Sequence, residues 1–110
     1  MEILTKLEEL ILLAVWKLKE DAYGVSIYNH LKKVTGQKMS VGSVYFPLDR
    51  LVKKRYLKAL KGEPTPKRGG MSKRYYLLTE AGLNILNDTK KVNDTMWDGY
   101  KVLKDKTIQA

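Results

Sequence analysis

The sequence of 110 residues contains no cysteine and a single histidine, His30. The lack of cysteine excludes disulfides and thiolate metal sites, and one histidine is too few for a histidine metal cluster. The sequence also lacks a paired nucleophile and base, a phosphate-binding glycine loop and a spaced pair of carboxylates. We therefore expect no enzyme, no bound metal and no cofactor.

Long hydrophobic runs are absent as well. The run from Leu10 to Trp16 is flanked closely by Glu8, Glu9 and Lys17. It is too short for a membrane span and does not have the layout of a signal peptide, so we expect a cytoplasmic protein without membrane contact. Apolar residues make up 44% of the chain, which predicts a folded protein whose modest core a partner subunit would help to complete.

The net charge of +9 is confined to one part of the sequence. Residues 38–74 hold 11 Lys or Arg and 2 acidic residues, whereas the other 73 residues hold 10 of each and are neutral overall. A clustered excess of positive charge is typical of a surface that binds a polyanion. Nucleic acid fits better than a membrane surface, because membrane-binding helices carry large apolar residues opposite their charges.

Residues 39–56 carry the pattern around which the chain is organised. At about 100° per residue, one face of a helix collects the apolar side chains Val44, Leu48, Leu51 and Val52. The opposite face collects Gly42, Phe46, Asp49, Arg50 and Lys53, with Ser43 and Lys54 beside them. Ser40 is a natural N-cap, and Pro47 predicts either a loose start or a kink. Such a helix suits a DNA groove; the alternative is an ordinary amphipathic helix with a solvated face.

Two further helices are expected before it, over residues 4–19 and 23–34. In the first, the core stripe consists of Leu7, Leu10, Ile11, Ala14 and Leu18. Leu12, Val15 and Trp16 fall partly outside this stripe, which predicts a second contact surface, most simply a dimer interface; the alternative is that Trp16 only covers the core of the monomer. In the second, Gly24 permits a close helix approach and Gly36 is a natural C-cap. Together with the basic helix, this makes a helix-turn-helix.

A β-hairpin is expected next, with strands over residues 57–61 and 72–78 and a turn-rich loop over 62–71. A hairpin directly after a basic helix is typical of a wing. Its tip carries Lys67, Arg68, Gly69 and Gly70, and Lys73 and Arg74 open the returning strand. Glycines suit a tip lying in a narrow groove and cations suit the flanking phosphates, although a flexible solvated tip would look similar.

The last expected element is a helix of about 28 residues, capped by Thr79. Heptad spacing connects Ile85, Thr89, Val92, Met96, Gly99 and Leu103, and Trp97 and Tyr100 flank this seam. A head of some 78 residues cannot bury so long a helix, so a partner chain is implied. The predicted fold is therefore mostly α with a small β-hairpin: a winged helix-turn-helix over residues 1–78 and a long C-terminal dimerisation helix over 79–110.

These motifs resemble the PadR family of winged-helix transcriptional regulators. The matching segments are Tyr23-Gly24, residues 40–45 (SVGSVY) with Leu48 and Leu51, residues 68–70 (RGG), residues 73–76 (KRYY) and residues 78–82 (LTEAG). The similarity covers roughly residues 7–86, and the short C-terminal helix is similar to that of the compact subclass. The resemblance implies a homodimer, formed through the first and last helices, that represses its own gene or a transporter or stress gene by binding a pseudo-palindromic operator.

The resemblance also implies that Tyr23, Ser40, Gly42, Ser43, Tyr45 and the basic residues of the wing contact DNA. The full set of expected DNA-binding residues is Tyr23, Lys38, Ser40, Gly42, Ser43, Tyr45, Phe46, Arg50, Lys53, Lys67, Arg68, Gly69, Gly70, Lys73 and Arg74. This sequence departs from the family pattern in having its proline at position 47 rather than at 41 and 46. It also departs at Arg55 and Tyr56, where the family has a glycine before the first wing strand.

Within this set, Ser43, Phe46 and Arg50 are the expected base-reading residues, and Lys38, Lys67, Lys73 and Arg74 are expected to neutralise phosphates. The expected dimer or effector surface consists of Leu12, Trp16, Val92, Met96, Trp97, Tyr100 and Leu103. Its aromatic rings either bind a flat apolar effector or only fill the interface. A second class of function remains open: a winged helix whose basic face binds an acidic protein partner.

Overall fold

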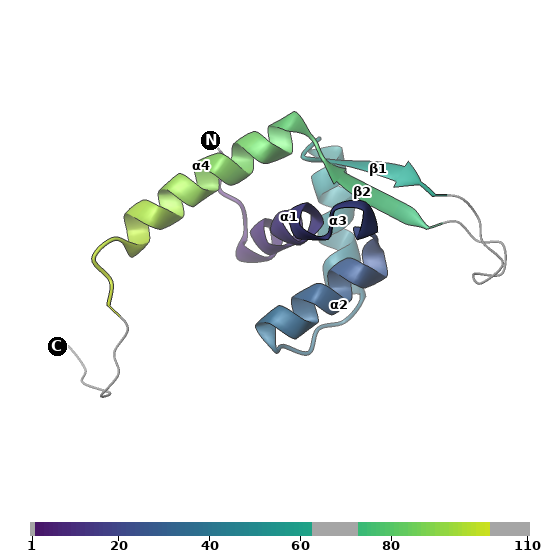
Figure 1. Cartoon of the computed structure of the whole chain (residues 1–110), viewed down its shortest axis with the longest axis horizontal. Coiled ribbons are helices and arrows are strands. Elements are labelled where there is room, and N and C mark those ends of the chain that lie inside the picture. The colour runs from purple at the N-terminus through teal and green to yellow at the C-terminus, as the bar shows by residue number, and fades with distance from the viewer. Residues whose placement is uncertain (1, 63–72, 102–110) are drawn as a thin grey trace.

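The computed structural model describes residues 2–62 and 73–101, which form a mostly helical fold with one antiparallel hairpin (Figure 1). Its elements are, in chain order, α1 (Lys6–Leu18), the short 3₁₀ helix η1 (Lys19–Asp21), α2 (Gly24–Thr35), α3 (Gly42–Lys53), β1 (Leu57–Lys61), β2 (Arg74–Leu78) and α4 (Glu80–Trp97). The predicted fold class, with a hairpin after the basic helix and a C-terminal helix, is confirmed. None of the helices within the described residues is long and apolar enough to cross a membrane.

Helix α1 lies at the centre of the molecule. It packs against α2, α3, β2 and α4, so apolar side chains are needed on more than one of its faces. Leu12 and Val15 are accordingly buried in the core. The prediction that Leu12 belongs to an outward contact surface is therefore wrong: that part of α1 faces the protein's own elements, while the neighbouring Trp16 is exposed.

The turn between α2 and α3 begins at the glycine that the sequence predicts as a C-cap. Helix α2 ends at Gly36, whose φ of 67° places it in the left-handed region that glycine favours. At the other end of α2, Gly24 lies against the Tyr45 ring, and a methyl group at position 24 would overlap the Tyr45 hydroxyl. The absence of a side chain at Gly24 therefore lets α3 approach α2 at this point.

Helix α3 begins tightly rather than loosely. The Ser43 and Val44 amides donate to the carbonyls three residues earlier, those of Ser40 and Val41. The N-cap position is Val41 and not the predicted Ser40, although the Ser40 Oγ still accepts a hydrogen bond from the Ser43 amide at 3.3 Å. Pro47 lies inside the helix and is buried. Because proline has no N–H, the Ser43 carbonyl has no donor one turn later, and the helix tolerates the loss close to its start.

The hairpin is tied to the helical head at its base. Leu57 pairs with Leu78 and Lys61 with Arg74. On the other side of β2, Tyr75 forms an isolated bridge with Tyr23, and the Tyr76 amide donates to the Ala22 carbonyl at 2.8 Å. The root of the hairpin is thus fixed to the start of α2. The expected tip residues Lys67, Arg68, Gly69 and Gly70 lie outside the described residues.

Helix α4 begins at the predicted cap, since the Thr79 hydroxyl accepts from the Gly82 amide at 3.0 Å. It extends over 18 residues and ends at Trp97, so the predicted length of about 28 residues is wrong. Gly99, with a φ of 80°, lies beyond the helix and not on a heptad seam, and Leu103 lies outside the described residues. Figure 1 shows α4 extending away from the hairpin along one side of the head.

Candidate nucleic-acid interface

The outward face of α3 carries a large apolar side chain among polar ones. Phe46 is 71% exposed. Its ring lies beside Gly42, where a Cβ would meet it at 3.5 Å. Ser43 and Lys53 are exposed on the same helix. Exposure of a phenylalanine ring to water does not stabilise the protein. In a DNA groove, the same ring can contact a thymine methyl group.

The start of α3 is held by short-range hydrogen bonds. The hydroxyl groups of Ser40 and Ser43 lie 2.8 Å apart, within hydrogen-bond distance. The Tyr28 hydroxyl donates to the Met39 carbonyl at 2.6 Å and so fixes the preceding turn. Lys38, just before this turn, is exposed. The tip of α3 is therefore an ordered, polar end with a cation beside it.

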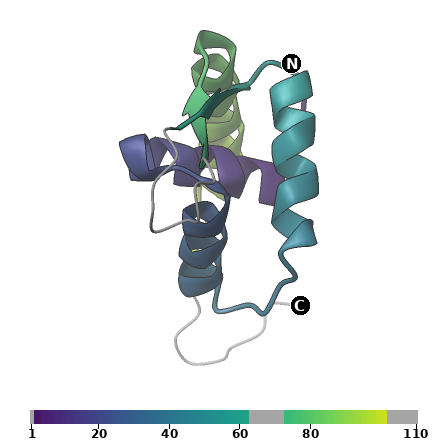
Figure 2. The same cartoon turned by 90° about the vertical axis from the view of Figure 1, so that its right-hand side faces the viewer.

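A small cleft of about 260 Å³ lies where α2, α3 and β2 meet. It brings together several predicted DNA contacts, and its lining is Tyr23, Gly24, Val25, Tyr45, Asp49, Lys73, Arg74 and Tyr76. The Lys73 ammonium lies 4.0 Å from the centre of the Tyr23 ring, in a cation–π contact. Arg74 lies 3.8 Å from the Asp49 carboxylate. The contact with Tyr23 places Lys73 beside the start of α2, and the contact with Asp49 places Arg74 beside α3. Figure 2 shows the same helices and hairpin with the molecule turned by 90°.

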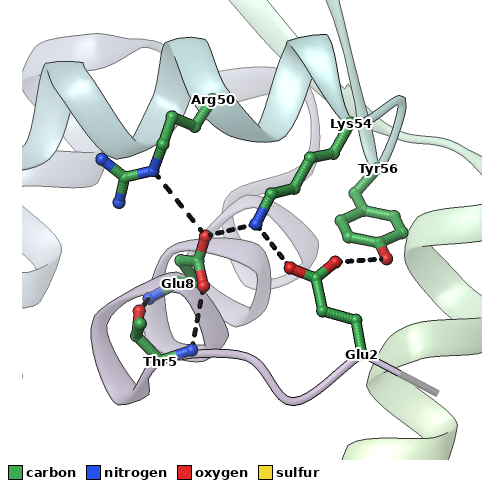
Figure 3. Close-up of polar contacts among 6 residues, drawn as sticks. All are labelled: Glu2, Thr5, Glu8, Arg50, Lys54 and Tyr56. Carbon is green, nitrogen blue, oxygen red and sulfur yellow. Dashed lines mark hydrogen bonds and ion pairs between the residues drawn. The ribbon is translucent and has the colours of Figure 1, made fainter.

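Arg50 and Lys54 face acidic side chains, a pairing that no local pattern in the sequence predicts. Lys54 Nζ donates to Glu2 Oε2 at 2.5 Å and to Glu8 Oε2 at 3.2 Å (Figure 3). Arg50 Nε lies 4.0 Å from the same Glu8 oxygen. The Tyr56 hydroxyl donates to Glu2 Oε1 at 2.8 Å. We call Glu2, Glu8, Arg50, Lys54 and Tyr56 the acid–base cluster. Its two carboxylates balance its two cations.

The pKa values of the two acids reflect this environment. Burial by itself raises the pKa of Glu8, but the hydrogen bond from the Thr5 backbone amide and the Lys54 ammonium outweigh it, and the pKa lies below its ordinary value. The hydrogen bonds from Lys54 and then from Tyr56 lower the pKa of Glu2. The hydrogen bond to Glu2 in turn raises the pKa of Lys54. All three groups are therefore charged at neutral pH.

A second surface lies between α1 and α4. A groove of about 510 Å³ is lined mainly by these two helices, with Leu13 and Trp16 from α1 and Leu83 and Leu86 from α4. Leu13, rather than the predicted Leu12, faces this groove. The predicted residues of α4 and its end are exposed: Val92, Met96, Trp97 and Tyr100. The rings of Trp97 and Tyr100 pack edge to face, with 5.2 Å between their centres.

The family can be assigned from comparison with known proteins. The model of the transcriptional regulator PadR-like family matches residues 11–88, which is well over half of the chain. The chain belongs to this family. Members of the PadR family are DNA-binding transcription regulators and not enzymes, so this chain is a DNA-binding transcription regulator.

Solved structures of other proteins share this fold. A PadR family transcription regulator from hypervirulent Clostridium difficile R20291 has a TM-score of 0.67 at 22% identity, covering 84% of this chain and 91% of that one. A PadR-like regulator from Bacillus cereus has a TM-score of 0.62 at 24% identity, covering 86% and 93%. RosR from H. salinarum has a TM-score of 0.64 at 25% identity, covering 89% and 81%. The search of curated proteins found no match.

Proposed function

We propose that this PadR-family chain is a homodimeric repressor that reads a pseudo-palindromic operator near its own gene or near a transporter or stress gene. The observation that carries the proposal is the outward face of α3, where Phe46 is 71% exposed between Ser43 and the cations of the helix. A surface that binds only phosphates needs no exposed aromatic ring, whereas on a helix that reads bases such a ring can contact a base edge.

The proposed DNA contacts fall into two groups, those that read bases and those that contact phosphates. Ser43, Phe46 and Arg50 are the proposed base-reading residues. Lys38, Lys53, Lys73 and Arg74 are the proposed phosphate contacts, and with the basic tip of the wing they would set the affinity and its salt dependence. Tyr45, held against Gly24, is proposed to donate its hydroxyl to a phosphate.

The proposed dimer uses the α1–α4 groove and the exposed aromatic residues beside it. Trp16, Met96 and Trp97 are 53%, 77% and 63% exposed, which is more apolar surface than a small monomer is expected to leave in water. Two half-sites about 10 bp apart would then match the two recognition helices of the dimer.

Control by a ligand is the finer part of the proposal. A flat apolar effector stacking on Trp16 or Trp97 would change the spacing of the two heads and so release DNA. The competing possibility is that these rings only fill the dimer interface. Titration of planar compounds against tryptophan fluorescence distinguishes the two, and no quenching across a broad panel would count against an effector.

The function is tested by binding to a labelled duplex from upstream of the chain's own gene, with a shuffled duplex of equal composition beside it, at low and near-physiological salt. We expect a preference for the native duplex that survives salt, and a loss of that preference in Phe46→Ala. Lys33→Ala, which removes one cation from an exposed position of α2, is the control and should bind like the wild type. A reporter gene behind the bound duplex then tests repression.

Equal binding to both duplexes that vanishes with salt would refute sequence reading. The remaining candidate would then be a winged helix that binds an acidic protein partner. The positive charge of residues 38–74 favours this alternative as much as it favours DNA, which is why the shuffled duplex, and not the salt dependence, is the deciding comparison.

A further inference from the structure

The acid–base cluster contains a buried carboxylate that is not among the proposed DNA contacts. Glu8 is only 2% exposed although it lies in the first turn of α1. A buried carboxylate is costly unless it is paired and hydrogen-bonded, so its partners indicate what it does.

The two oxygens of Glu8 have separate partners. Oε1 accepts from the Thr5 amide at 2.9 Å, and the Glu8 amide donates to Thr5 Oγ1 at 3.1 Å. This reciprocal pair is a capping box, which needs an acceptor but no charge and is made by glutamine as well as by glutamate. Oε2 faces α3 instead, with Lys54 Nζ at 3.2 Å and Arg50 Nε at 4.0 Å.

The Arg50 guanidinium contacts Glu8 through Nε, while both terminal nitrogens lie on the side away from Glu8 (Figure 3). The Arg50 side chain is still 54% exposed. An arginine whose Nε lies beside a carboxylate keeps its two terminal nitrogens available for a guanine edge. If the ion pair with Glu8 restricts the side chain in the free protein, less conformational freedom is lost on binding.

We propose that Glu8 is a positioning residue for sequence reading, and that its buried carboxylate orients Arg50 on the recognition helix for contact with a base. The inference rests on the proposed function, since it requires Arg50 to contact DNA. Glu8 itself does not touch DNA. It acts from α1 across the helix interface, and Glu2 assists by holding Lys54 at the same carboxylate.

The test is Glu8→Gln, which keeps the capping-box acceptor and removes the charge. The ratio of affinities for the native and the shuffled duplex is expected to fall about tenfold, because a loose Arg50 discriminates less between bases. Affinity for the shuffled duplex should rise instead, because the change frees positive charge, and the salt slope should steepen by up to about 0.9.

The matched control is Glu20→Gln in η1. The Glu20 side chain is exposed and is not among the residues that line the α1–α4 groove, so this variant makes the same change of charge away from α3 and from the proposed dimer surface. It should leave the affinity ratio unchanged. Arg50→Ala should lower the ratio, and adding Glu8→Gln to Arg50→Ala should lower it no further.

A measurement on the wild-type protein keeps the test independent of how the variant folds. The ¹⁵N order parameter of the Arg50 Nε–H group should exceed that of the exposed Arg55, since values below about 0.6 indicate a flexible group. Equal mobility of the two groups would overturn the proposal.

The outcomes also distinguish failure of the proposed role of Glu8 from failure of the proposed function. If the wild type prefers the native duplex and Arg50→Ala weakens that preference but Glu8→Gln does not, the role of Glu8 is refuted and the proposed function stands. If Arg50→Ala leaves the preference intact, Arg50 does not read a base and the role of Glu8 falls with it. If the wild type shows no preference, both proposals fail.

Discussion

Replacing Arg55 with glycine should stabilise the protein. Arg55 has a φ of 67°, in the left-handed region that non-glycine residues adopt only at a cost. The surrounding backbone is fixed: the Tyr56 amide donates to the Leu51 carbonyl and the Arg55 amide to the Val52 carbonyl, each at 3.0 Å. The Thr79 hydroxyl donates to the Arg55 carbonyl at 2.6 Å. The bonds of the Tyr56 and Arg55 amides form a Schellman motif at the end of α3. In this motif the position of Arg55 is usually occupied by glycine.

The magnitude follows from two opposing contributions. A residue with a Cβ in the left-handed region costs roughly 1–2 kcal/mol. Glycine recovers this strain but loses more conformational entropy on folding, which costs roughly 0.5–1 kcal/mol. The net expectation for Arg55→Gly is a gain of up to about 1.5 kcal/mol in the free energy of unfolding. The middle of this range, about 0.75 kcal/mol, corresponds to about 4 °C in Tm for a chain of this size.

Gly36 provides the reciprocal experiment, because its φ is also 67° and a Cβ there would meet nothing within 4 Å. Gly36→Ala should therefore lose about 1 kcal/mol from backbone strain alone. Both variants are compared with the wild type by urea unfolding at a fixed protein concentration, so that the proposed dimer contributes equally to each measurement. If Gly36→Ala destabilises the protein but Arg55→Gly gives no gain, the arginine side chain must make a stabilising contact that compensates for its strained backbone, and the reasoning is wrong.

Three further predictions concern packing, pH and assembly. Gly24→Ala should displace the ring of Tyr45, whose hydroxyl it would overlap, and cost about 1–3 kcal/mol in urea unfolding together with weaker DNA binding; unchanged stability would contradict this contact. Because the pKa values of Glu2 and Glu8 are lowered in the folded state, their stabilisation is present above the ordinary pKa of 4.5 and is lost as the pH falls through the lowered values. When the free energy of unfolding is measured between neutral and acid pH, it should fall less steeply in Glu8→Gln than in the wild type. Equal slopes would show that ionised Glu8 does not contribute to the pH dependence of stability. Trp16→Lys should convert the proposed dimer to a monomer in sedimentation while the circular dichroism of the head is kept; a persistent dimer would exclude this face.

Local signals in the sequence predicted much of the fold. Gly36 and Thr79 end and begin helices where their conformational and capping preferences place them. The spacing of Val44, Leu48 and Leu51 identified the buried face of α3, and all three are buried. These features depend on neighbours within one or two turns, which a sequence displays directly.

The errors concern features that depend on distant partners. Apolar periodicity predicts one buried face for a helix, but α1 packs against other elements on several sides. The width of its apolar surface therefore suggests a dimer interface in the sequence, whereas Leu12 belongs to the core of the monomer. The heptad spacing continued past Trp97, where the backbone leaves the helix. The pairing of Glu8 with Lys54 joins residues 46 positions apart, and no local pattern identifies such a pair.

The bridge between Tyr23 and Tyr75 has a consequence for behaviour at high concentration. An uncovered strand edge can recruit a strand from another molecule and begin aggregation. Strand β2 pairs with β1 on one side and meets Tyr23 on the other, so its outer edge is partly occupied. Strand β1 forms the opposite edge, and its exposed Lys58 and Lys61 place positive charge where an identical strand would have to dock. Like charges then repel a second copy of the chain at this edge, which should keep the hairpin from starting aggregation at high protein concentration.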